Sequence, residues 1–505
     1  MGVRRGSGWA GVMLAVSIAS AAAAGAAEPA RLGSLSFSGC DLKNPSQGEL
    51  LGALCARLDV PENPEAPDGR KISLRIGWVK ATRAEPLADP VFFIAGGPGQ
   101  SAVEAFPLVA PGFARILEKR NVILVDQRGT GESNPLDCSD EIGIEGATEE
   151  AAEDENVAEN ADAAQAAATK RCLATLAGKA DPRYYTTSIA VTDLERVRLA
   201  IGAAQINLIG VSYGTRVAQV YLRSYPTQVR SLVLDGVVPP ELILGNEHAR
   251  NLENAVQGIF QRCREQPACH AAFGDPAADL ATLQAALRAQ PMVVDYRDPK
   301  SGEALQEELT AGDVGGVVRM FAYAPETAAL LPLALHEAAN GKADALLAQS
   351  RLVSGDLGEQ ITQAMQMAVI CSEDAHGFRA RSEDANTLMG NAFITTMQAQ
   401  CAAWPKGARP DDFHVAVNSD VPALLLSGEF DPVTPPRYGE STVAHFSHGR
   451  HLVGPGRGHG LLSAGCVPRL VADFIDHNDT AKLDGDCLQD FAVIPAFVNR
   501  NGWIP

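Results

Sequence analysis

Five short, almost wholly apolar runs set the strongest constraint on how this chain can fold. They lie at 91–95, 121–126, 206–210, 231–235 and 423–427, each bounded by glycine or polar turn residues. Runs of this kind are typical of strands buried on both faces of a parallel sheet. Helical patterns at 193–201 and 215–225 separate some of them, and residues 72–79 alternate like a half-exposed strand. This order predicts an α/β protein whose mostly parallel sheet is covered by helices on both faces.

Residues 240–410 interrupt this alternation. They lack strong strand signals and carry long helical patterns, for example at 328–339 and 359–370. We therefore predict a sheet domain with a helical insertion, rather than several independent domains. The predicted division is a first core segment at 28–240, a helical cap at 241–410 and a second core segment at 411–505.

The first 27 residues have the pattern of an export signal. Arg4 and Arg5 precede a short apolar stretch at 9–19, and small residues follow up to Ala27. A basic start, an apolar middle and an Ala-x-Ala-like end predict a signal peptide cleaved after Ala26 or Ala27. The alternative is an uncleaved anchor, although the apolar part is short for spanning a bilayer. We expect an exported protein, periplasmic or extracellular, with no membrane span in its mature form.

The charge balance argues against one class of partner. The chain has 42 Lys and Arg against 61 Asp and Glu, which gives a net charge of −19. Binding to nucleic acid requires clustered basic residues, because phosphates must be neutralised. The sequence therefore predicts no nucleic-acid partner, and it leaves the oligomeric state open.

The ten cysteines fit an exported protein, because disulfides persist in oxidising compartments. The sequence contains no Cys-x-x-Cys, so a zinc or redox site is not expected. Sequence alone leaves many pairings open, and the simplest joins neighbours along the chain. The predicted pairs are Cys40–Cys55, Cys138–Cys172, Cys263–Cys269, Cys371–Cys401 and Cys466–Cys487.

The strongest chemical signal surrounds Ser212. The segment 210–214 reads Gly-Val-Ser-Tyr-Gly, directly after a predicted strand and before a predicted helix. That context is what a nucleophile elbow requires, with the serine on a sharp turn between strand and helix. The backbone N–H of Tyr213 would then point at a developing oxyanion. The alternative is an ordinary glycine-rich turn.

A serine hydroxyl needs a base, and the sequence offers an acid and a histidine in the expected order. Asp431 follows the run at 423–427, and His459 lies between two glycines 28 residues later. We expect His459 to take the Ser212 proton and Asp431 to orient and stabilise the imidazolium. The rival acid is Glu429, and the rival histidines are His445, His448 and His451.

A second oxyanion donor is expected in the loop after an earlier strand. Residues 96–101 read Gly-Gly-Pro-Gly-Gln-Ser and follow the run at 91–95 directly. Glycines allow close backbone approach, and we choose the N–H of Gly97 as the donor. A plain strand-to-helix turn is the alternative.

Four ordered motifs resemble one family. They are Gly-Gly-Pro-Gly at 96–99, Asp-Gln-Arg-Gly-Thr-Gly-Glu-Ser at 126–133, Gly-Val-Ser-Tyr-Gly at 210–214 and Asp-Pro-Val-Thr-Pro at 431–435. Together they resemble the prolyl iminopeptidase and tripeptidyl aminopeptidase family of α/β-hydrolase serine peptidases, most of all the secreted tripeptidyl aminopeptidases. One departure is Ala95, where prolyl iminopeptidases usually have histidine.

The resemblance implies an α/β-hydrolase fold, an inserted helical cap and no metal or organic cofactor. It also implies cleavage of short peptides near a free N-terminus, with Asp126 and Arg128 bracing the site. An exopeptidase must recognise the α-ammonium of its substrate, and a carboxylate is its natural partner. Family members carry acids in the cap for this purpose, and we choose Glu373, with Asp374 as substitute; a solvated helix end is the alternative.

Two other functions remain open at this level. The α/β-hydrolase fold hosts many chemistries, so a carboxylesterase or another small-molecule hydrolase could use the same three residues. A hydrolase-like binding protein is a third class. The complete set of serine, acid, histidine and glycine loop argues against that third class.

Overall fold

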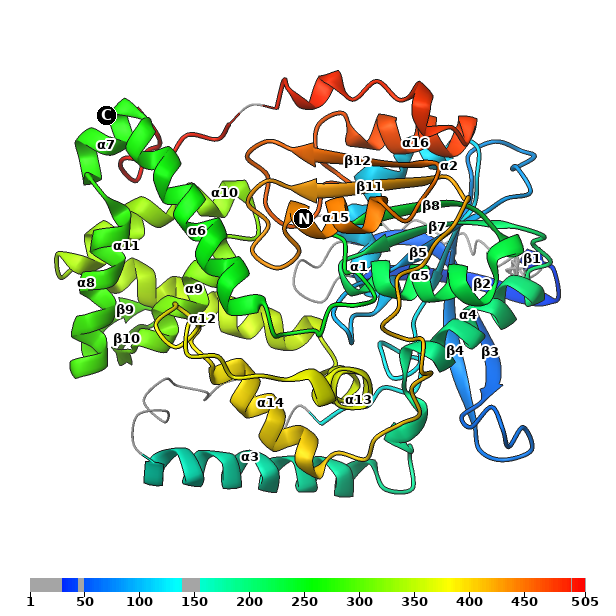
Figure 1. Ribbon diagram of the computed structural model, residues 1–505, viewed down its shortest axis with the longest axis horizontal. Helices are drawn as coiled ribbons and strands as arrows, with labels where there is room; N and C mark the ends of the chain where they lie inside the picture. The colour runs from blue at the N-terminus through cyan, green and yellow to red at the C-terminus, as the bar shows by residue number, and fades with distance from the viewer. Residues whose placement is uncertain (1–29, 44–49, 139–154, 492, 505) are drawn as a thin grey trace, which may run out of the picture.

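The computed structural model describes residues 30–43, 50–138, 155–491 and 493–504. The predicted export signal at 1–27 lies outside the described residues. Figure 1 shows a twisted sheet with its helices on one side of the molecule and a mainly helical region on the other. The candidate active site lies where these two regions meet.

A ten-stranded sheet forms the core of the described part of the chain, in the order β1-β2-β3-β4-β6-β5-β7-β8-β11-β12. The antiparallel edge consists of β1 (Ala30–Leu32), β2 (Leu35–Lys43), β3 (Leu50–Pro61) and β4 (Lys71–Val79). The parallel part consists of β5 (Val91–Ile94), β6 (Val122–Val125), β7 (Ile206–Val211), β8 (Val229–Asp235), β11 (Ala423–Gly428) and β12 (Gly449–Gly454). All five apolar runs are strands of this parallel part, so the predicted α/β class is confirmed.

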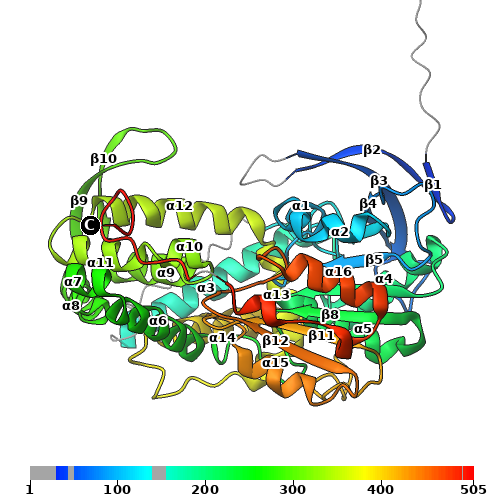
Figure 2. The same cartoon turned by 90° about the horizontal axis from the view of Figure 1, so that it is seen from above.

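Helices cover both faces of the sheet (Figure 2). One face packs against α1 (Ala102–Val109), α2 (Ala114–Leu117) and α16 (Val467–His477). The other packs against α4 (Thr187–Ala200), α5 (Tyr213–Ser224) and α15 (Pro436–Val443). The buried apolar side chains of the parallel strands divide between these two layers, which explains why the runs show no alternation.

The strand register brings three loops to one edge of the sheet. Ile94 of β5 lies opposite Gly210 of β7, and Val211 lies opposite Asp235 of β8. The carboxyl ends of these strands therefore stop at the same level. The glycine loop after β5, the turn at Ser212 and the residues after β8 meet at that edge, which is the usual ligand edge of an open parallel sheet.

Between β8 and β11 lies a segment that we call the insert, α6 to α14. Its helices are α6 (His248–Glu265), α7 (Pro267–Phe273), α8 (Pro276–Ala289), α9 (Ala311–Phe321), α10 (Pro325–Ala328), α11 (Leu331–Ala339), α12 (Asp344–Gln360), α13 (Gln363–Glu373) and α14 (Ala392–Ala403). It also holds an antiparallel hairpin of β9 (Met292–Arg297) and β10 (Ala304–Leu309), which the sequence patterns did not predict. The helical pattern at 359–370 is divided at Ile361 and Thr362, where α12 ends and α13 begins.

The insert has a hydrophobic core of its own, formed by α6, α8, α9, α11, α12 and the hairpin. Helix α13 differs, because its buried residues belong to the core cluster on the sheet face that α4 and α5 cover. Helix α14 packs beside α3 (Glu155–Leu176), where the Gln400 side chain donates a hydrogen bond to the Gln165 side chain at 3.0 Å.

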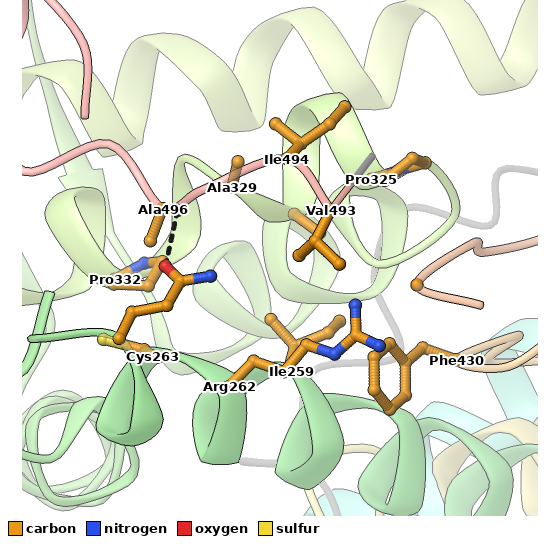
Figure 3. A pocket seen from close by; sticks show the side chains of 13 residues that line it. Ile259, Arg262, Cys263, Pro325, Ala329, Pro332, Phe430, Val493, Ile494 and Ala496 are labelled. Carbon is orange, nitrogen blue, oxygen red and sulfur yellow. Dashed lines mark hydrogen bonds between the residues drawn. The ribbon is translucent and has the colours of Figure 1, made fainter. Parts of the chain in front are cut away.

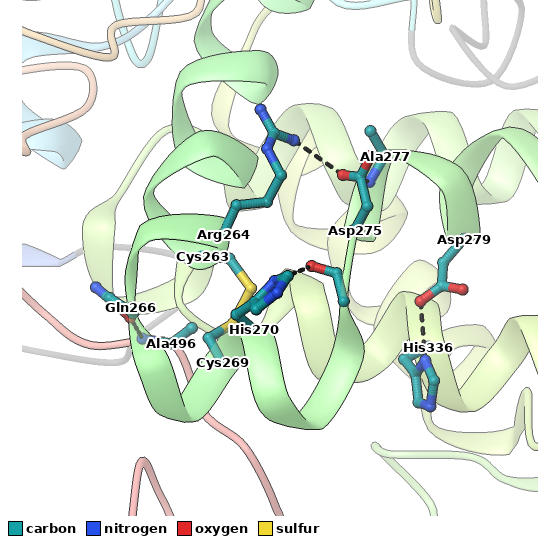
Figure 4. Close-up of a disulfide and its surroundings, with 11 residues drawn as sticks. Cys263, Arg264, Gln266, Cys269, His270, Asp275, Ala277, Asp279, His336 and Ala496 are labelled. Carbon is teal, nitrogen blue, oxygen red and sulfur yellow. Dashed lines mark hydrogen bonds and ion pairs between the residues drawn. A yellow bond between two sulfur atoms is a disulfide. The ribbon is translucent and has the colours of Figure 1, made fainter.

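The ten cysteines form the five neighbouring pairs: Cys40–Cys55, Cys138–Cys172, Cys263–Cys269, Cys371–Cys401 and Cys466–Cys487. Cys40–Cys55 joins β2 to β3, and Cys371–Cys401 joins α13 to α14. Figure 4 shows Cys263–Cys269, which joins the end of α6 to α7. Each bridge therefore ties elements that are close in the chain.

The chain after α16 returns to the insert. The backbone N–H of Ala496 donates to the Gln266 side chain at 3.1 Å, and that of Phe497 donates to the Ala329 carbonyl at 2.9 Å. Arg500 forms an ion pair with Glu337 at 3.1 Å. This C-terminal tail is a third chain connection between the insert and the sheet, besides the two ends of the insert.

Candidate active site

Ser212 lies on a strained turn between β7 and α5. Its φ of 54° and ψ of −126° are unusual for a residue with a side chain. The glycines around it allow strand and helix to approach, because a Cβ on Gly210 would lie 2.4 Å from the Gly214 carbonyl oxygen. A Cβ on Gly214 would lie 2.3 Å from the Ile94 carbonyl oxygen. The geometry is that of the nucleophile elbow inferred from the sequence.

The glycine loop after β5 lies against this turn. A Cβ on Gly96 would be 3.0 Å from the Cβ of Ser212, a contact tighter than side chains usually make, so glycine eases this approach. Gly97 and Gly99 both have positive φ, 102° and 107°. Tyr213 is the first residue of α5, where backbone N–H groups have no partner within the helix. Gly96, the residue before Gly97, thus lies against Ser212, and Tyr213 follows Ser212 directly in the chain.

Asp431 and His459 form a close pair. Nδ1 of His459 lies 2.8 Å from Oδ2 of Asp431, and the Asp431 carboxylate is buried. Its Oδ1 accepts hydrogen bonds from the backbone N–H groups of Val433 at 2.9 Å and Thr434 at 2.7 Å. An Nδ1 proton shared with Asp431 leaves Nε2 of His459 available as a base.

The two groups shift each other's pKa. Burial lowers the pKa of His459, but the charge and hydrogen bond of Asp431, together with the charge of Asp235, outweigh burial and raise it above 6.5. Burial raises the pKa of Asp431, but the His459 charge and the hydrogen bonds that it accepts lower it overall. The pair therefore favours a charged carboxylate beside an imidazole that binds a proton readily.

The end of β8 lies close to both Ser212 and His459. The Ser212 N–H donates to the Asp235 carbonyl at 2.8 Å, and a Cβ on the next residue, Gly236, would lie 3.0 Å from Cε1 of His459. Among the described residues, no hydrogen bond joins the Ser212 hydroxyl to His459. Such contacts are often loose in free enzymes and tighten when substrate binds.

Three further residues support the histidine, and local sequence patterns did not identify them. The Thr434 hydroxyl lies 2.8 Å from Oδ2 of Asp431 and 3.1 Å from Nδ1 of His459. Asp235 accepts hydrogen bonds from the N–H groups of Leu461 and Leu462 at 2.8 Å. From the insert, the backbone carbonyl of Tyr323 accepts a hydrogen bond from the backbone N–H of His459 at 2.7 Å, and the two rings meet edge to face. The motif at 431–435 contains Thr434, but its position alone gives no sign of this contact.

The rival residues lie elsewhere. Glu429 pairs with Arg262 at 2.7 Å and accepts the Gly456 N–H. His451 contacts the Ser427 hydroxyl at 2.9 Å, and His445 contacts the Asn418 side chain at 3.0 Å. None of these contacts involves Ser212.

Glu373 and Asp374 are both buried and already have partners. Glu373 accepts hydrogen bonds from the N–H and the hydroxyl of Thr187 at 2.6 and 2.8 Å. Asp374 pairs with Arg216 at 2.9 Å, and both side chains are fully buried. Burial, together with the charge of Asp374, raises the pKa of Glu373 to about 8. Both acids are therefore engaged in contacts within the protein, and neither carboxylate is exposed to bind a substrate ammonium.

Asp126 and Arg128 brace the surrounding loops. Asp126 accepts hydrogen bonds from the Ser101 hydroxyl at 2.6 Å and the Val103 N–H at 3.0 Å, which fixes the start of α1 after the glycine loop. Arg128 pairs with Asp193 at 2.7 Å and is fully buried. These contacts agree with the supporting role that the resemblance implies.

A distinct pocket lies beside this site, between α6, α10 and the C-terminal tail (Figure 3). Its walls include Ile259, Pro325, Val493 and Ile494. The Arg262 guanidinium lies over the Phe430 ring at 4.5 Å along one side. Ser212 and His459 do not line it, so we do not place the reaction there.

The fold and the residues at its edge define a serine hydrolase of the α/β-hydrolase fold. The family described as alpha/beta hydrolase fold matches residues 89–307, and the TAP-like protein family matches residues 386–487. Within the described ranges, no helix is long and apolar enough to cross a membrane.

Known relatives agree with this class. The serine protease Hip1 of Mycobacterium tuberculosis is 25% identical over 492 residues, which cover 91% of this chain and 92% of the relative. The tripeptidyl aminopeptidase of Streptomyces lividans is 25% identical over 401 residues, 75% of this chain and 73% of the relative. Carboxylesterase B of Mycobacterium tuberculosis is 29% identical over 241 residues, 46% of this chain and 42% of the relative. The resemblance to tripeptidyl aminopeptidases is thus confirmed.

Proposed function

We propose that this chain is an exported serine aminopeptidase that releases residues from the free N-termini of short peptides. Ser212 would attack the scissile carbonyl, His459 would take its proton and Asp431 would stabilise the resulting imidazolium. The N–H groups of Gly97 and Tyr213 would bind the oxyanion, and the acyl-enzyme would then be hydrolysed by water.

One observation supports short peptides as the substrates of this hydrolase. The insert reaches the reacting residues directly, since Tyr323 binds the His459 backbone and packs against its ring. An insert that covers the reacting residues restricts the site to substrates that can enter between the insert and the sheet. Short peptides fit that restriction, and folded proteins do not. The similarity to the tripeptidyl aminopeptidase of Streptomyces lividans supports the same substrate class.

Export and the division of the chain belong to this proposal. We propose that 1–27 is a signal peptide, that 28–240 and 411–505 form the hydrolase core, and that 241–410 forms its cap. Five disulfides among the ten cysteines support an oxidising destination, periplasmic or extracellular.

A substrate panel tests the function. We expect fluorogenic Pro-, Ala- or Ala-Ala-Pro- amides to be cleaved, and N-terminal acetylation of the same peptides to abolish cleavage. The Ser212→Ala variant should be inactive while its circular dichroism and melting temperature stay close to wild type. Turnover of acyl esters without any amide release would instead favour the carboxylesterase alternative, which similarity to carboxylesterase B supports.

A further inference from the structure

Helix α13 of the insert contacts the glycine loop that carries one proposed oxyanion donor and is linked through Thr187 to Tyr213, which carries the other. At its N-terminal end, the Thr362 N–H donates to the Gly99 carbonyl at 3.0 Å, in the loop that carries Gly97. The fit there is tight, because a Cβ on Gly99 would lie 2.6 Å from the Thr362 carbonyl oxygen. At its C-terminal end, α13 finishes at Glu373. One helix thus contacts the glycine loop at its start and Thr187, the neighbour of the Tyr213 hydroxyl, at its end.

A chain of short hydrogen bonds connects Glu373 to Tyr213. Both Glu373 carboxylate oxygens bind Thr187, one at its N–H and one at its hydroxyl. The Thr187 hydroxyl lies 2.6 Å from the Tyr213 hydroxyl. All three side chains are buried, with exposed fractions of 1% for Glu373, 0% for Thr187 and 1% for Tyr213.

We propose that Thr187 and Glu373 are positioning residues for the Tyr213 oxyanion donor, so that α13 sets the geometry of the oxyanion hole. The proposed oxyanion donor is the backbone N–H of Tyr213, whereas the hydroxyl at the end of its ring is held by the hydrogen bond with Thr187. Fixing the hydroxyl end of a buried ring restricts rotation of the whole residue at the start of α5. Catalytic donors must be held to within a fraction of an ångström, which requires such support. The inference rests on the proposed serine mechanism.

The alternative role for Glu373 makes a different prediction. A ligand of the substrate ammonium would matter only for substrates that carry a free amine, and its loss would raise KM. A positioning residue acts on the transition state of every acyl substrate, and its loss would lower kcat. A free-amine peptide amide and p-nitrophenyl acetate, which has no amine, therefore separate the two roles.

The test compares Thr187→Val, Tyr213→Phe, their double variant and Glu373→Gln. We expect each single change to lower kcat about tenfold on both substrates, a part of the 10²–10³ that a lost donor costs. KM should change little, Thr187→Ser should retain activity, and the double variant should be no worse than either single one. Thr192→Val is the matched control on α4, where the hydroxyl bonds only within its own helix.

Three outcomes would overturn the inference. One is wild-type kcat in Thr187→Val and Tyr213→Phe while Ser212→Ala is inactive, which leaves the proposed function intact. Another is a Glu373→Gln variant with raised KM for the peptide and unchanged ester turnover, which makes Glu373 an amine ligand. Retained turnover in Ser212→Ala would remove the proposed function itself, and this inference with it.

Discussion

The backbone N–H of Ser212 donates a 2.8 Å hydrogen bond to the carbonyl oxygen of Asp235, and the Asp235 carboxylate binds the N–H groups of Leu461 and Leu462. One residue at the end of β8 therefore holds the nucleophile with its backbone and the histidine loop with its side chain. Burial raises the pKa of this carboxyl group to about 6, against the effect of the backbone N–H groups that it accepts. The sheet register makes this double contact possible.

Replacing Asp235 with Asn should separate these tasks. The Asn variant keeps the carbonyl that binds Ser212 but loses the charge and one acceptor oxygen that hold the His459 loop. We expect kcat to fall by about tenfold or more, and unfolding free energy to fall by about 1–3 kcal/mol for the unsatisfied group. Steady-state kinetics and urea unfolding measure both. The exposed Asp490→Asn should change neither, and unaltered kinetics in Asp235→Asn would refute the assignment.

The pH profile tests the pairing of Asp431 with His459. His459 acts as a base only when neutral, and Asp431 raises its pKa above 6.5, so kcat/KM should fall as pH decreases through that raised value. In Asp431→Asn the stabilising charge is lost, and the acidic limb should move to lower pH. The rate should drop by about 10⁴, as for the equivalent change in a serine protease triad. An acidic limb that stays in place in Asp431→Asn would contradict the pairing.

Gly214 provides a steric test of the nucleophile turn. Its Cβ would lie 2.3 Å from the Ile94 carbonyl oxygen, so Gly214→Ala must displace the end of β5. We expect a loss of about 1–3 kcal/mol in unfolding free energy, together with reduced kcat because the glycine loop follows β5. Gly316→Ala, in an open position of helix α9, should instead gain about 0.5–1 kcal/mol. Thermal and chemical unfolding would show the opposite signs, and equal effects would contradict the packing.

The buried Arg216–Asp374 ion pair joins α5 to the end of α13. Arg216→Met removes the arginine that pairs with the buried Asp374 carboxylate, which should cost about 3–5 kcal/mol of stability. Adding Asp374→Asn removes that charge and should recover part of the loss. A double-mutant cycle by urea unfolding measures the coupling, and additive losses would contradict a direct pair.

The sequence was sufficient to predict the parts that depend on local pattern. Buried parallel strands need unbroken apolar runs, and the turn at Ser212 needs glycines on either side, so both leave a readable signal. Strands β9 and β10 were missed because they are largely exposed; β10 carries Glu307 and Glu308, and an exposed hairpin needs no apolar run.

The contacts of Glu373 could not be predicted in the same way. Its partner Thr187 lies 186 residues away in the chain, and no local pattern encodes such a distance. From the sequence, Glu373 and Asp374 were two acids at a helix end, beside a cysteine. Their burial follows from where α13 packs. That position is held by contacts with Gly99 at one end of the helix and with Arg216 at the other.

The C-terminal tail limits how the insert can move. A body joined to another only near its two chain ends can turn about the line between them, as a hinged domain does. Here Ala496 and Phe497 attach the tail to α6 and the α10–α11 corner, away from both ends of the insert. This attachment adds to the contacts of Tyr323 with His459 and of α13 with Gly99 and Arg216, and together they oppose such a rotation. Moving this insert into another hydrolase would therefore require transferring the tail with it.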